Sequence, residues 1–105
     1  MNKPWLAQYP KSVPKTIDPD RYGSIVELYE ECFDRFRLHP MSICMGVTHT
    51  YDDIDKASLA VAAWLQAQGL PQGSVVALMM PNVPQYLPTM IGILRAGYVC
   101  TPVNP

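Results

Sequence analysis

The sequence predicts an α/β fold in which a leader, a helix, a β-hairpin and a second helix precede a parallel strand-helix-strand unit. Two amphipathic helical patterns each begin at a capping residue, and two short Val-rich runs near the end enclose a third helical pattern. Four of the eleven prolines fall within the first 22 residues. A chain of 105 residues can form one small domain.

Residues 1–22 are predicted to form an extended leader, and residues 23–105 the α/β unit. Proline fixes φ and lacks an amide hydrogen, so its repeated use here disfavours both helix and sheet. We expect the apolar side chains of the leader to anchor it on another surface. A ligand for a proline-recognition domain is disfavoured, because Pro10 to Pro14 lacks the P-x-x-P step. The anchoring side chains are Trp5, Tyr9, Val13, Ile17 and Tyr22.

The first helix is predicted to start at Ser24, which forms an S-x-x-E capping box with Glu27. It should end by Leu38, because Pro40 disfavours helical geometry at His39. The apolar side chains recur at helical spacing and predict a core-facing stripe. They are Ile25, Leu28, Tyr29, Cys32, Phe33 and Phe36.

A short β-hairpin is predicted to follow, with strands at 42–45 and 47–49 and a turn at Gly46. Thr50 and Asp53 form a second capping box, which opens a helix ending near Gln68 with Gly69 beyond it. The inner face of this helix is predicted to be Ile54, Ala57, Val61, Trp64 and Leu65.

The strand-helix-strand unit is predicted from residue 74 onward. The run 74–79 is continuously apolar, as in a parallel strand that is covered on both faces, and 98–103 supplies its partner. Asn82 is the expected cap of the intervening helix, which should end at Gly97. If that helix begins at Val83, Pro88 should bend it; otherwise the regular helix begins closer to Pro88. Its inner side chains are predicted to be Leu87, Met90, Ile91 and Leu94.

Charge is distributed very unevenly. Residues 57–105 contain a single charged side chain, Arg95, while residues 22–56 contain three basic and seven acidic groups. We expect another part of a larger protein to cover the uncharged half, although an ordinary apolar half-domain would also explain it. The net charge of −1 provides no basic field for nucleic acid.

No residue set in the sequence predicts catalysis, cofactor binding or metal binding. The loop 80–84 lacks the glycines of a phosphate-binding loop. His39 and His49 do not have ligand spacing, and the carboxylates 52, 53 and 55 are expected to stabilise a helix N-terminus. The spacings of the three cysteines fit neither a zinc site nor a redox pair, so reduced thiols in a cytoplasmic protein are expected. No signal peptide or membrane-spanning run is apparent.

Short segments distributed over the whole chain form a recognisable series. They are Trp5-Leu6, Tyr9-Pro10, Val13-Pro14, Ile17, Pro19, Tyr22, Ser24, Thr50-Tyr51, Val76-Ala77-Leu78-Met79-Met80-Pro81-Asn82, Gln85-Tyr86, Gly92-Ile93-Leu94-Arg95-Ala96-Gly97 and Val103-Asn104-Pro105. In this order they closely resemble the N-terminus of bacterial long-chain fatty acid-CoA ligases, which are adenylate-forming enzymes. The Gly92 to Gly97 segment is shared across adenylate-forming enzymes, and the leader narrows the resemblance to the fatty-acyl branch.

The resemblance implies a parent enzyme that uses ATP and Mg²⁺ to convert a long-chain fatty acid to an acyl adenylate, and then CoA to form acyl-CoA. The family's nucleotide and catalytic motifs are absent from residues 1–105, so the resemblance assigns no catalytic residue here. It implies the N-terminal part of a larger layered domain, whose remainder is this segment's partner. The parent is expected in the cytoplasm, with peripheral contact to the inner membrane, and the isolated segment is expected to self-associate. The alternative is a stand-alone truncated module that binds a full-length ligase or a membrane surface.

Overall fold

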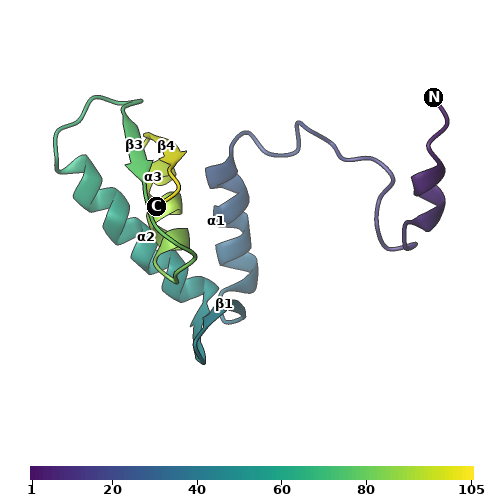
Figure 1. Cartoon of the computed structure of the whole chain (residues 1–105), viewed down its shortest axis with the longest axis horizontal. Coiled ribbons are helices and arrows are strands. Elements are labelled where there is room, and N and C mark those ends of the chain that lie inside the picture. Colours follow the sequence, from purple (N-terminus) through teal and green to yellow (C-terminus); the bar gives the residue numbers. More distant parts are fainter.

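The computed structural model describes all residues from 1 to 105 (Figure 1). Its elements follow the predicted order, with a short 3₁₀ helix added in the leader. They are η1 (Pro4–Gln8), α1 (Ile25–Phe36), β1 (Pro40–Cys44), β2 (Val47–Thr50), α2 (Tyr51–Gln66), β3 (Val75–Leu78), α3 (Tyr86–Arg95) and β4 (Val99–Pro102). The mixed α/β fold class predicted from the sequence is confirmed.

The leader projects away from the rest of the chain (Figure 1). The prediction of a wholly extended leader is wrong at 4–8, because Pro4 takes the first position of η1, where its fixed φ suits a helical turn and its missing amide is not needed. No residue of η1 packs against another helix or strand. The end of the leader lies close to α1, where Arg21 and Glu31 form an exposed ion pair at 3.8 Å.

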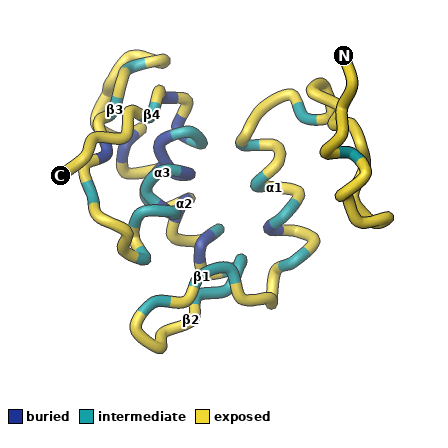
Figure 2. The backbone as a smooth tube through the Cα atoms, turned by 45° about the vertical axis from the view of Figure 1, so that its right-hand side comes forward, coloured by how far each residue is buried: buried dark blue, intermediate teal, exposed yellow.

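Helix α1 begins where predicted, but its capping box is only half formed. The Ser24 hydroxyl accepts the Glu27 amide at 3.1 Å, whereas the Glu27 carboxylate accepts the Gly23 amide at 2.8 Å instead of that of Ser24. Of the predicted apolar stripe only Phe33 is fully buried, and Ile25 and Leu28 are exposed. In this half of α1 it is Val26 and Glu30 that face α2, where they line a hollow with Leu59 and Ala62, and Figure 2 shows most of α1 coloured as exposed or intermediate.

The hairpin pairs β1 and β2 in antiparallel register, with Cys44 opposite Val47. Met45 and Gly46 occupy the turn with φ of 49° and 80°. Two successive left-handed residues match the right-handed twist of the flanking strands. Met45 therefore belongs to the turn, and its predicted placement in the first strand is wrong.

Helix α2 opens with a complete capping box. The Asp53 amide donates to the Thr50 hydroxyl at 3.2 Å, and the Thr50 amide donates to the Asp53 carboxylate at 2.8 Å. The predicted inner face is partly wrong, because Trp64 is 64% exposed and Ala57 is also exposed. Helix α3 packs instead against a neighbouring line of residues on α2. The buried residues on that line are Ile54, Ser58, Ala62 and Leu65.

Helices α2 and α3 approach closely at Gly92. A Cβ atom placed there would lie 2.7 Å from the Val61 Cβ and 2.8 Å from the Ser58 carbonyl oxygen, so only glycine fits. Two apolar clusters form around this contact. One contains Ala62, Leu65, Leu78, Ile93, Ala96 and Tyr98, and the other Phe33, Ile54 and Ile91.

Strands β3 and β4 are parallel, with Val75 opposite Val99, and α3 connects them as predicted. The predicted Asn82 cap is wrong, since α3 begins at Tyr86 and its cap position, Gln85, makes no side-chain bond. Pro88 is thus the third residue of α3, in the first turn, where an amide has no partner within the helix. Of the two alternatives predicted for this helix, the regular helix beginning close to Pro88 is therefore the correct one.

The two-stranded sheet is covered on one face only. Leu78 is buried under the helices, whereas the side chains on the opposite face are exposed. The predicted coverage of both faces is therefore absent within these 105 residues. The exposed side chains are Val75, Ala77, Val99 and Thr101.

Candidate functional site

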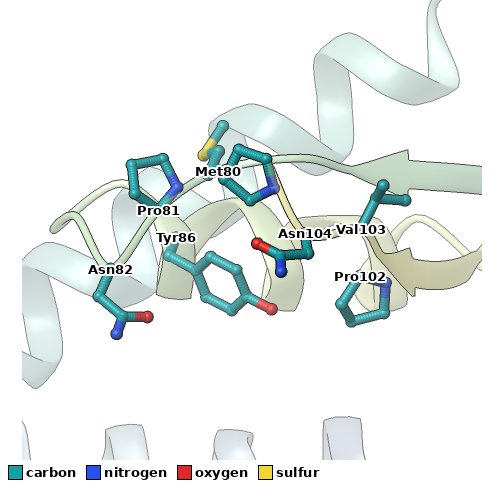
Figure 3. Close-up of a pocket in the computed structure, with 8 residues that line it drawn as sticks. Met80, Pro81, Asn82, Tyr86, Pro102, Val103 and Asn104 are labelled. Carbon is teal, nitrogen blue, oxygen red and sulfur yellow. The ribbon is translucent and has the colours of Figure 1, made fainter.

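A hollow of about 390 Å³ lies beyond the carboxyl ends of β3 and β4 (Figure 3). In open parallel sheets, ligands bind in the crevice outside these strand ends, so this is the first place to test for a site. Its polar side chains are Asn82, Tyr86 and Asn104, and none of the lining residues is charged. The lining residues are Met80, Pro81, Asn82, Tyr86, Pro102, Val103, Asn104 and Pro105.

The chemistry of this hollow does not fit ATP or Mg²⁺. Pro81 and Pro84 have no amide hydrogen, and the Val83 amide already donates to the Pro81 carbonyl at 2.8 Å. The loop therefore cannot surround a phosphate with backbone donors. The two amides and one phenol can hydrogen-bond a neutral group, but they supply neither a positive charge nor a general base.

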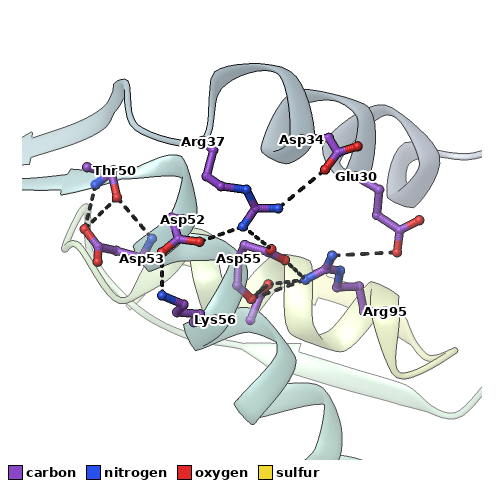
Figure 4. A network of polar contacts seen from close by, with 10 residues as sticks. Glu30, Asp34, Arg37, Thr50, Asp52, Asp53, Asp55, Lys56 and Arg95 are labelled. Carbon is purple, nitrogen blue, oxygen red and sulfur yellow. Dashed lines mark hydrogen bonds and ion pairs between the residues drawn. The ribbon is translucent and has the colours of Figure 1, made fainter.

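A buried ion-pair cluster joins α1, α2 and α3 (Figure 4). The Arg95 guanidinium donates to the Asp55 carboxylate at 2.6 Å and to the Ser58 hydroxyl at 2.9 Å, and it lies 3.6 Å from Glu30. Its Cζ also lies 5.0 Å from the centroid of the Phe33 ring. The Arg95 side chain is only 9% exposed and that of Asp55 only 15%, so the two charges neutralise each other away from water.

A second, more exposed group of charges continues from this cluster. Arg37 donates to Asp52 at 2.7 Å, and Lys56 also binds Asp52 (Figure 4). The hydrogen bonds from Lys56 and Arg37 lower the pKa of Asp52 below its ordinary value. The backbone amide and the hydroxyl of Thr50 lower the pKa of Asp53 in the same way.

These carboxylates lie at the N-terminus of α2 as predicted, and each is held by partners within the chain. Asp53 caps α2, Asp52 binds Lys56 and Arg37, and Asp55 binds Arg95. No group of His, Cys, Asp and Glu side chains could hold a metal ion. The arrangement therefore positions the helices relative to one another. Sequence reasoning missed the pairing of Asp55 with Arg95, although a lone arginine in an otherwise uncharged half was a usable signal.

Acid is expected to weaken the start of α2. Asp52 and Asp53 both have a pKa below the ordinary 3.8 in the folded chain. The stability that these carboxylates give to the fold is therefore fully present above that value and is lost as the pH falls through the folded pKa. The melting temperature should therefore drop below about pH 4, and Asp53→Asn should make this drop smaller. Thermal melts followed by circular dichroism would check it, with Asp20→Asn in the leader as the control. An unchanged acid response in Asp53→Asn would contradict this role of Asp53.

The histidines and cysteines are scattered. The exposed His39 ring lies edge-on to Phe36 at 5.9 Å, and His49 is partly buried on β2. The cysteines at 32, 44 and 100 are free and partly buried, and burial raises the pKa of Cys100. No helix is both long enough and apolar enough to cross a membrane.

Comparison with known proteins identifies the family. Residues 29–105 match the family described as AMP-binding enzyme. This chain belongs to the AMP-binding enzyme family. The family-level expectation drawn from the segment Gly92 to Gly97 is thereby confirmed.

Within the AMP-binding enzyme family, the chain is similar over its whole length to long-chain-fatty-acid-CoA ligases. It is 46% identical over 106 residues to the one from Yersinia pestis and 47% identical to the one from Salmonella typhimurium. Each alignment covers 100% of this chain and 19% of the relative. The chain thus covers about a fifth of the length of these relatives.

The fold resembles that of the N-terminal subdomain of NpsA from Klebsiella oxytoca. The TM-score is 0.73 at 27% identity, over 77% of this chain and 21% of that one. The helices, hairpin and parallel strand pair described above are therefore those of the N-terminal subdomain of an adenylate-forming enzyme.

Proposed function

We propose that this chain is the N-terminal structural segment of a long-chain fatty acid-CoA ligase. The supporting observation is identity of 46–47% to such ligases along the entire chain. The parent would activate a long-chain fatty acid with ATP and Mg²⁺ to an acyl adenylate, and would then transfer the acyl group to CoA. It would work in the cytoplasm with peripheral contact to the inner membrane.

Within that parent, the segment would build the fold and leave the chemistry to the other residues. Its hollow is uncharged and its buried charges are paired with one another, so no catalytic, cofactor-binding or metal-binding residue is proposed here. The open sheet face with Val75 and Val99, and the unpaired outer edges of β3 and β4, are where the remainder of the ligase would pack. Residues 23–105 would thus form an incomplete subdomain, with 1–22 as its leader.

A chimeric ligase tests this proposal. Residues 1–105 would replace the matching segment of the Yersinia pestis relative, and the chimera should make acyl-CoA from a long-chain fatty acid, ATP and CoA, because the replaced part contributes no reacting group. A chimera carrying Gly92→Val is the matched control and should lose folding and activity. Turnover by residues 1–105 alone, or a folded chimera without activity, would overturn the proposal.

The alternative function is a stand-alone module that binds a full-length ligase or a membrane surface. The exposed apolar face of the sheet is the observation that supports this alternative. Reading the genomic frame beyond residue 105 separates the two. A frame that continues into a Ser/Thr/Gly-rich loop supports the ligase segment, and a stop codon supports the module.

The isolated segment is expected to self-associate. Both strands of the β3–β4 sheet have an unpaired outer edge, and Val75 and Val99 are exposed on its open face, so pairing between copies would satisfy free backbone groups and bury apolar surface. Size-exclusion chromatography with light scattering should show dimers or larger species. Val75→Lys, which places a charge on the open face, should shift the population toward monomer, with the exposed Ala60→Lys on α2 as the control. A compact monomer that does not bind the dye ANS would contradict this expectation.

A further inference from the structure

We draw no further inference here: the strongest candidate, the hollow between α1 and α2 that Val26, Leu59 and the buried Arg95 line, is a surface of a chain that spans 19% of its relatives, and nothing in the structure shows what covers it.

Discussion

Asp55→Ala is expected to destabilise the chain by about 3–5 kcal/mol, because it leaves the buried Arg95 charge without its main partner. The two side chains are 15% and 9% exposed, and their contact at 2.6 Å joins α2 to α3. Ser58 still accepts a hydrogen bond from Arg95 at 2.9 Å, but its hydroxyl is uncharged. The Glu30 carboxylate is charged, but it lies 3.6 Å away. Urea unfolding followed by circular dichroism would measure the change.

The double variant Asp55→Ala with Arg95→Met should recover most of this loss. It removes both charges and keeps an apolar side chain over Phe33. A buried ion pair often contributes little or no more to stability than well-packed apolar residues in its place. Lys56→Ala, which breaks the exposed pair with Asp52, is the matched control and should have a small effect. If Asp55→Ala and Lys56→Ala had equal effects, the cluster around Arg95 would not be the structural link that its geometry indicates.

Gly92→Ala is expected to lower stability by about 2 kcal/mol, although alanine ordinarily favours helix over glycine by about 1 kcal/mol. The added methyl group would sit 2.7 Å from two carbon atoms of Val61 and 2.8 Å from the Ser58 carbonyl oxygen. The side chain of Val61 can adjust, but the carbonyl belongs to the α2 backbone, so α2 and α3 must move apart. The urea midpoint of the variant should fall accordingly.

Val61→Ala provides the test of this mechanism. Combined with Gly92→Ala, it removes part of the clash, so the double variant should lose less stability than the sum of the two single variants. A Gly92→Ala chain with a urea midpoint equal to or above that of the original would show that α2 and α3 are not in close contact there.

Local signals predicted most of the secondary structure. Ser24 and Thr50 start α1 and α2, and Gly97, with φ of 87°, follows the end of α3. These signals succeed because a capping bond or a left-handed glycine involves residues only a few positions apart. Where local signals competed, as at Asn82 and Pro88, the sequence left two starting points for α3, and steric exclusion by proline decided between them.

The sequence by itself determined the order of elements, their approximate limits and the family resemblance, because each depends on neighbouring residues or on motifs read in order. Only the tertiary structure decided which face of α2 is buried, that Trp64 is exposed, and that Arg95 pairs with Asp55. The last contact spans 40 positions. Helix α2 offers several lines of small or apolar side chains, at positions 54, 57, 58, 61, 62, 64 and 65. The choice among these lines is made by the close approach of Gly92 on α3. Helical periodicity alone contains no information about that partner.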